Sequence, residues 1–225
     1  MKSSFTSQAV VPALAALLLG VPAWADTLTV ATFADPSPSS MDPLFTVDLG
    51  ADRITSTWGP GKTGLDLEVI LTGITYPDAY FTLSQDAAGL IPGIRYVDNP
   101  PGSFYGPTRK GFIRFFAADD TPLMRIKFNA AFLTPGGVGA DEIVSLNIVD
   151  IRGPALPGGG AGLTDEGFGF AFANQVRLPG PDPTDPGDDL LKATASFTSS
   201  AVPEPSMVTL FGFGLLTVAR RRRRT

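Results

Sequence analysis

The sequence predicts an all-β fold, an antiparallel β-sandwich or jelly-roll-like domain, between two terminal segments that lie outside it. Apolar and polar residues alternate with a period of two in several short segments, which is the pattern of half-buried strands. Among 225 residues there are 25 glycines and 21 prolines, which divide the chain into short elements and leave no helical pattern of convincing length. No repeat of fixed period is present, which argues against a solenoid or a propeller.

In the clearest predicted strand, Met124, Ile126 and Phe128 face one way, and Arg125 and Lys127 face the other. The same alternation, or a short apolar run between turn residues, predicts the other strands. In chain order, the predicted strands are 27–33, 44–48, 53–58, 65–71, 79–84, 93–97, 111–117, 123–128, 144–148 (with Val144, Leu146 and Ile148 on its apolar face), 167–176 and 192–198.

Clusters of glycine and proline mark the turns between these strands. Asn99–Gly102 and Pro135–Gly137 have the composition of turns. The longest cluster, Pro154–Gly162, is too rich in both residues for a regular element, and we predict a long flexible loop there. In Pro181–Asp188, acidic residues recur at every third position, which predicts a stiff acidic turn or spacer unless Gly187 folds it back.

Residues 1–25 have the composition of a secretory signal peptide. Lys2 precedes an apolar run from Val10 to Val21, which is too short to anchor a chain permanently. Small residues at Ala23 and Ala25 fit the pockets of signal peptidase, so we expect cleavage after the second of them. A buried core helix is the alternative, but prolines interrupt the segment and it has no polar face. We therefore expect export.

The C-terminus carries three consecutive parts. The segment Pro203-Glu204-Pro205 is held extended, because each proline fixes its own φ and disfavours helix in the residue before it. An apolar stretch of 13 residues, 207–219, follows. As a helix it rises only about 20 Å against about 30 Å of hydrocarbon, so we expect a short transmembrane helix that inserts marginally. Behind it, five arginines form a stop-transfer signal that keeps the C-terminus in the cytoplasm. They are Arg220, Arg221, Arg222, Arg223 and Arg224.

These three parts, in this order after an exported domain, resemble the PEP-CTERM sorting signal of Gram-negative bacteria. The resemblance implies transient capture in the inner membrane and recognition of Pro203, Glu204 and Pro205 by an exosortase-type transpeptidase or protease. It also implies removal of the tail and delivery to the cell surface or extracellular matrix. A single-pass anchor that is never cut is the alternative. The chain thus divides into a signal peptide (1–25), an exported domain (26–201) and a sorting tail (202–225).

The composition excludes several chemistries. Histidine and cysteine are absent from the sequence, which excludes a Ser-His-Asp triad, imidazole and thiolate metal ligands, a thiol nucleophile and disulfides. The whole chain has a net charge of −5, and removal of its basic ends leaves an exported domain near −10. Such a charge favours solubility, repels anionic polymers and argues against nucleic acid as a partner.

Aromatic residues in loops are candidates for sugar binding. We select Phe104 and Tyr105 in a loop rich in proline and glycine, with Trp58 and Tyr76 as further candidates. A loop aromatic that closes the end of the core is the alternative. In Gly167–Phe172, three phenylalanines share one strand face and small residues the other. This pattern favours a core strand whose small face admits another backbone, over a stacking platform for sugars.

Pairs of acidic residues near predicted loops are the remaining candidate chemistry. Asp119-Asp120, Asp141-Glu142 and Asp165-Glu166 offer the oxygen ligands that Ca²⁺ prefers. Ordinary solvated turns explain the same pairs, so we predict neither a metal nor another cofactor.

The sequence therefore favours an exported, non-catalytic surface or extracellular-matrix-associated protein. Signal peptidase and an exosortase are its expected processing partners, and extracellular polysaccharide is a candidate partner. A secreted carbohydrate-binding module is the second hypothesis. A carboxylate-dependent glycosidase is the third, because any two acids at the right separation qualify and nothing in the sequence selects a pair.

Overall fold

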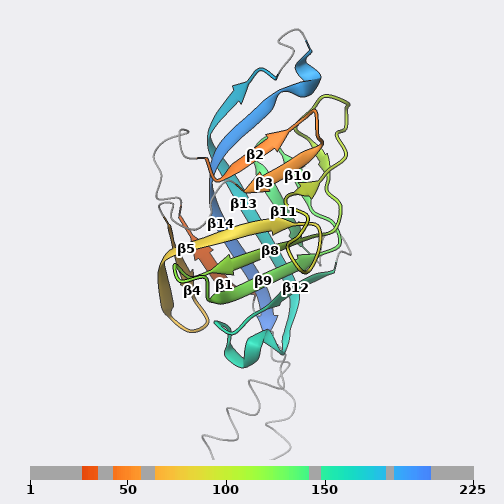
Figure 1. The fold of residues 1–225 in the computed structure, drawn as a ribbon. Helices are drawn as coiled ribbons and strands as arrows, with labels where there is room; N and C mark the ends of the chain where they lie inside the picture. Colours follow the sequence, from red (N-terminus) through yellow and green to blue (C-terminus); the bar gives the residue numbers. More distant parts are fainter. Residues whose placement is uncertain (1–26, 35–42, 57–63, 142–147, 181–184, 204–225) are drawn as a thin grey trace, which may run out of the picture. The chain divides into compact units, whose positions relative to one another are not determined.

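Antiparallel strands make up nearly all of the regular structure (Figure 1). The structure, a computed structural model, describes residues 27–34, 43–56, 64–141, 148–180 and 185–203. These ranges contain no α-helix, and thus no helix long and apolar enough to cross a membrane. The predicted signal peptide, transmembrane helix and arginine cluster lie outside the described residues.

Two strands near the end of the chain, β13 and β14, are the longest and run side by side in Figure 1. Short 3₁₀ turns, η1 (Pro157–Gly160) and η2 (Pro186–Asp188), precede them. The strands are β1 (Leu28–Phe33), β2 (Phe45–Asp48), β3 (Arg53–Ser56), β4 (Leu65–Val69), β5 (Ile74–Ser84), β6 (Ile94–Arg95), β7 (Gly106–Pro107), β8 (Gly111–Phe116), β9 (Pro122–Phe128), β10 (Phe132–Thr134), β11 (Gly137–Asp141), β12 (Val149–Arg152), β13 (Leu163–Leu178) and β14 (Leu190–Pro203).

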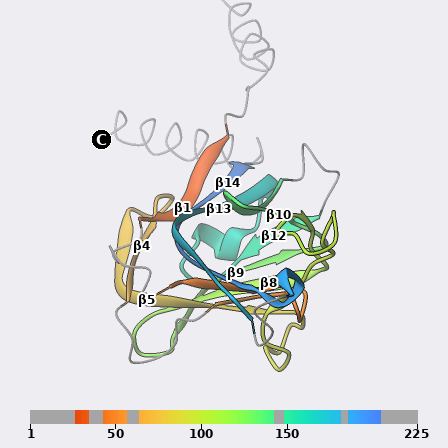
Figure 2. The same cartoon turned by 90° about the horizontal axis from the view of Figure 1, so that it is seen from above.

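The strands form one continuous antiparallel sheet in the order β12-β9-β8-β5-β4-β1-β14-β13-β11-β10-β7, with β2 on β14 and β3 and β6 beyond it. The long β5 changes partner midway, because its first half pairs with β4 and its second half, from Tyr80, pairs with β8. The sheet therefore curls, and Figure 2 shows β8 and β9 on one side and β13 and β14 on the other. The all-β, antiparallel prediction is confirmed, but β5 joins the two halves, which are not the separate sheets of a sandwich.

Phenylalanine side chains fill the space between the two halves. The ring of Phe81 on β5 lies 5.3 Å from that of Phe170 on β13, and Phe115 on β8 lies 4.9 Å from Phe197 on β14. All four are buried. Burial of each such side chain stabilises the fold by about 1.5–3 kcal/mol. Since the sequence has no cysteine, this packing holds the halves together without cross-links.

Two local predictions differ from the structure. Ile148, predicted on the apolar face of a strand 144–148, is 55% exposed, and residues 144–147 lie outside the described part. The described strand there is β12, which begins at Val149 and turns Val149 and Ile151 to the core. The predicted flexible loop Pro154–Gly162 contains the turn η1, is held by a hydrogen bond from Gly153 N–H to Gly159 C=O (3.1 Å), and buries Leu156.

The acidic segment between β13 and β14 turns the chain back on itself. Leu178 pairs with Leu190 across the hairpin, and the Asp185 carboxylate accepts a hydrogen bond from Gly187 N–H (2.8 Å). The described residues 185–188 thus contain the turn expected if Gly187 folds the segment back. Residues 181–184 lie outside the described part.

The phenylalanine core predicts a large effect of a single truncation. Phe170 contacts the rings of Phe45, Phe81 and Phe197, so Phe170→Ala should lower the free energy of unfolding by about 3–5 kcal/mol. The matched control is Phe132→Ala, because Phe132 is 41% exposed and its loss should cost about 1 kcal/mol or less. Urea unfolding of the purified variants measures both values. Equal losses would show that the core described above does not hold the fold.

Candidate functional site

An open groove crosses the face of the sheet opposite the core, over strands β4, β1, β14, β13, β11 and β10. Residues directly opposite one another in antiparallel strands point to the same face, so the strand register places a continuous row of side chains along it. An acidic residue ends the row on one side and an aromatic residue ends it on the other, with only glycine and threonine between them. In strand order the row is Glu68, Thr32, Thr198, Gly169, Gly139 and Phe132.

Small side chains leave the space that forms the groove, whose volume is about 1070 Å³. Two glycines of β11 are required by the backbone of β13. A Cβ atom on Gly137 would lie 1.9 Å from the carbonyl oxygen of Phe170, and one on Gly139 would lie 2.7 Å from that of Phe168. A second row of small residues beside the first consists of Ser196, Ala171, Gly137 and Thr134.

An aromatic pair forms one rim of the groove. Phe132 lines it, and the ring of Tyr105 meets the Phe132 ring edge-on with centroids 4.9 Å apart. Both remain accessible, with 41% and 44% of their surface exposed. Exposed carboxylates of Asp66 and Glu68 on β4 form the opposite rim. The groove thus offers ring faces, hydroxyl groups and hydrogen-bond acceptors along one continuous surface.

The predicted sugar-binding residues do not come together as a set. Tyr105 lies at the aromatic rim, whereas Phe104 is partly buried against the core, with the Arg177 guanidinium 5.4 Å from its ring centroid. Tyr76 also packs against the core from β5, and Trp58 lies outside the described residues. For Phe104 and Tyr76 the structure therefore favours the alternative of aromatics that pack on the core.

Sequence reasoning missed Phe132 and the groove itself. Phe132 belongs to a strand of three residues, too short to give a periodic signal. The interpretation of Gly167–Phe172 as a core strand is confirmed, because Phe168, Phe170 and Phe172 are buried. Its small face was predicted to admit another backbone, but a Cβ atom on Gly169 would meet no atom within 4 Å, and this face is the floor of the groove.

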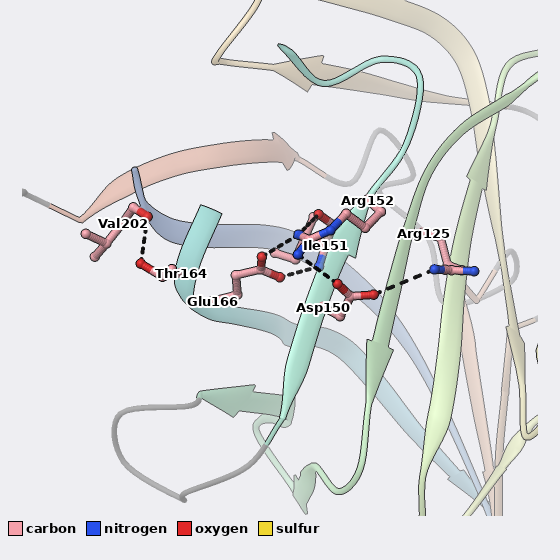
Figure 3. Close-up of polar contacts among 7 residues, drawn as sticks. All are labelled: Arg125, Asp150, Ile151, Arg152, Thr164, Glu166 and Val202. Carbon is pink, nitrogen blue, oxygen red and sulfur yellow. Dashed lines mark hydrogen bonds and ion pairs between the residues drawn. The ribbon is translucent and has the colours of Figure 1, made fainter. Parts of the chain in front are cut away.

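A second polar arrangement lies where the curled sheet brings β12 against β13, a contact that we call the seam (Figure 3). The buried Glu166 carboxylate of β13 accepts hydrogen bonds from the backbone N–H of Ile151 and, at 2.7 Å, from the Arg152 guanidinium. Arg152 also pairs with Asp150 at 3.0 Å, and Asp150 lies 3.6 Å from Arg125. The seam is thus closed by a side chain and not by a backbone ladder.

Glu166 lies at a β-bulge of β13. Asp165 and Glu166 together oppose Ala201 of β14, and Asp165 has a φ of 48°. From the bulge onward, Glu166 alternates with period two in step with the buried Phe168 and Phe170, so its side chain also faces inward, where it meets β12. The sequence analysis groups Asp165-Glu166 with the acidic pairs near loops, because two adjacent acids have the composition of a solvated turn.

Burial raises the pKa of Glu166 from 4.5 to about 7, although the hydrogen bonds from Arg152 and Ile151 favour the charged form. Glu166 has the properties of a general acid, but its two oxygens are occupied by Ile151 and Arg152. It also does not line the groove. Its position fits a role in closing the sheet.

The acidic pair Asp119-Asp120 also has structural partners. Asp119 accepts a hydrogen bond from Thr121 N–H (3.0 Å) in the β8–β9 turn, and Asp120 accepts one from the Tyr80 hydroxyl. Burial and this contact raise the pKa of Tyr80 to about 12. In the part of the chain that the structure describes, no group of acidic side chains is arranged to hold a metal ion. Glu142 lies outside that part.

The predicted sorting tail begins within the folded sheet. Pro203 is the last residue of β14 and pairs with Leu163, the first residue of β13. Its neighbour Val202 pairs with Thr164, whose hydroxyl donates a hydrogen bond to the Val202 carbonyl at 3.1 Å (Figure 3). Glu204, Pro205 and the residues after them lie outside the described ranges.

The seam predicts a specific pH dependence. The folded chain holds the Glu166 proton up to about pH 7, whereas the unfolded chain releases it near pH 4.5. The contribution of Glu166 to stability is therefore complete below pH 4.5 and is lost as the pH rises through 7, by an amount of order 3 kcal/mol. The glutamine of Glu166→Gln does not titrate. The free energy of unfolding of the parent, relative to that of this variant, should therefore fall as the pH rises from 4.5 through 7.

Urea unfolding at pH 4, 5.5, 7 and 8 measures this difference. Glu68→Gln, which removes an exposed carboxyl from β4, is the control. If Glu166→Gln and Glu68→Gln follow the same pH profile, the seam carboxyl does not behave as its burial requires.

Comparison with known proteins gives a match at the C-terminus. Neither the curated proteins nor the solved structures include a match to the chain. The family described as the PEP-CTERM protein-sorting motif matches residues 201–224, so the resemblance of the tail is confirmed, and this part of the chain carries a PEP-CTERM sorting motif.

Proposed function

We propose that this chain is an exported, non-catalytic protein of the cell surface or extracellular matrix, and that an exosortase removes its tail. The sorting motif at residues 201–224 carries the proposal, since it indicates an exported protein that an exosortase recognises and sorts to the cell surface. The individual processing steps are inferred from the sequence. Signal peptidase cleaves after residue 25, and the segment 207–219 with its arginines holds the chain in the inner membrane until it is processed.

The non-catalytic part of the proposal is supported by how the carboxylates are used. A glycosidase requires one carboxylic acid with a raised pKa beside a second carboxylate at the substrate. Glu166, whose pKa is raised, is bound within the seam by Ile151 and Arg152. Asp66 and Glu68, which line the groove, are both exposed. This arrangement favours binding over hydrolysis.

The groove favours a second function, the binding of a carbohydrate chain. Sugar rings stack on aromatic faces, and their hydroxyl groups donate to carboxylate and hydroxyl oxygens. The groove provides both, with Phe132 and Tyr105 at one rim and Asp66 and Glu68 at the other. Among the described residues that line it there is no lysine or arginine. The expected ligand is therefore a neutral glycan and not an anionic one, since acidic polymers would be repelled.

Removal of the tail should depend on the rigid motif itself. Replacing Pro203, Glu204 and Pro205 with alanine leaves the apolar stretch and the arginines able to insert but removes both fixed φ angles and the charge. The variant should accumulate as a membrane protein that keeps residues 206–225. Replacing Pro181, Asp182 and Pro183 with alanine is the matched control, because that triplet has the same proline-acid-proline order outside the tail.

Intact-mass measurement of both variants in a bacterium that processes the parent chain tests this prediction. If the first variant is trimmed as completely as the parent, the sorting motif is not what the processing enzyme reads.

Binding of neutral glycans should depend on the aromatic rim. In a glycan array followed by titration calorimetry with the full chain in detergent, Phe132→Ala and Tyr105→Ala should each weaken binding about tenfold. Phe112→Ala is the control, because Phe112 is a partly exposed phenylalanine on β8, outside the groove. Binding that survives both rim substitutions, or that favours uronic-acid polymers, would contradict this use of the groove.

A further inference from the structure

The end of β14 and the start of the sorting motif are the same residues. β14 ends at Pro203, and Pro203 is also the first residue of the Pro-Glu-Pro segment. In Figure 3, Val202 lies beside Thr164 of β13, whose hydroxyl donates to the Val202 carbonyl. In the structure, Val202 and Pro203 are therefore part of a paired strand.

The pairing of these two residues is separate from the rest of the sheet. On the other side of β14, the ladder with β1 ends at the pair of Leu28 with Ala201. On the β13 side, the bulge at Asp165 interrupts the ladder, so that Val202 and Pro203 pair with β13 beyond the interruption. Among the described strands, these two residues are thus held by the start of β13 alone.

The two strands differ in how firmly they are held at this point. On β13, the second residue of the bulge is Glu166, which is fixed to β12 through Ile151 and Arg152. On β14, Val202 and Pro203 have no corresponding attachment to a third described strand. Among the described contacts, β13 is thus fixed beside this point to a third strand, and the end of β14 is not.

We propose that the start of β13 holds the end of β14 in a paired form that the exosortase does not bind, so that Val202 and Pro203 must unpair before the tail is processed. The inference rests on the proposed function, since it concerns the same processing step. An enzyme that binds an extended segment uses the main-chain groups and both sides of the segment. In the folded sheet the Val202 carbonyl is already bonded to the Thr164 hydroxyl, and Pro203 lies in the ladder opposite Leu163.

The unpairing involves no unfolding of the core. Terminal residues of a strand separate locally at far lower free energy than the whole domain unfolds. The Thr164 hydroxyl adds one hydrogen bond to the paired form, and its loss should favour the unpaired form about fivefold. Processing therefore responds to this local pairing while the domain stays folded.

A pair of engineered cysteines tests the inference directly. Thr164 and Val202 are directly opposite in the antiparallel ladder, at the separation that a disulfide spans, and the chain has no other cysteine. In the full-length Thr164→Cys/Val202→Cys chain, expressed in a bacterium that processes the parent, the oxidised form should keep its tail. Addition of dithiothreitol should restore removal of the tail to the parent level.

The matched control is Val176→Cys/Lys192→Cys. These residues are also directly opposite on β13 and β14, but they lie far along the ladder from Val202, and neither lines the groove. The disulfide of this variant should leave processing unchanged. Single substitutions give a graded test, since Thr164→Val should speed removal of the tail about fivefold and Thr164→Ser, which keeps the hydroxyl, should not.

The outcomes distinguish the two proposals. If the oxidised 164–202 variant loses its tail as fast as the reduced one, unpairing is not required and the inference fails while sorting by the exosortase stands. If the control disulfide blocks processing equally, the effect comes from rigidifying the domain and not from the end of β14, and the inference also fails. If the parent chain itself keeps its tail, both the proposed function and this inference are overturned.

Discussion

The alternation of side chains along the paired strands β13 and β14 is the constraint on which the rest of the molecule depends. Phe168, Phe170 and Phe172 of β13 and Phe197 of β14 face the core, where they meet rings from the other half of the sheet. The intervening positions carry only small residues. With no disulfide available, the aromatic face supplies the burial that closes the curled sheet, and the small face becomes the floor of the groove. One sequence pattern therefore produces both the core and the candidate binding surface.

This pattern also explains what could be predicted from the sequence. The period-two alternation predicts the strands around Met124 and Phe170, and it places only small residues on the second face of Gly167–Phe172. The period-two pattern does not identify the strand with which each predicted strand pairs. Glu68 and Phe132 lie at the two ends of one row only because β4 and β10 take particular places in the strand order. Such places depend on contacts between distant segments, so the groove had no local signal.

In the seam, the burial of the charged residue Glu166 could not be predicted for the same reason. Glu166 is buried because it lies on the same face of β13 as Phe168, and because β12, which comes from an earlier part of the chain, lies opposite its side chain. The position of β12 has no signal in the sequence around Asp165-Glu166, which has the composition of a solvated turn. The tail could be predicted because its signal is local: two prolines, a short apolar stretch and a cluster of arginines act through composition and order, and they need no partner from the fold.

The end of β14 belongs both to the folded sheet and to the locally encoded sorting tail. The bulge that contains Glu166 interrupts the ladder before Val202, so the last residues of β14 pair with β13 next to the point where Glu166 anchors β13 to β12. The free energy needed to release those residues is thus set by two strand pairs and the Thr164 hydroxyl, and the phenylalanine core does not enter it. A domain arranged in this way can present its terminal segment to a processing enzyme while the core and the groove stay intact.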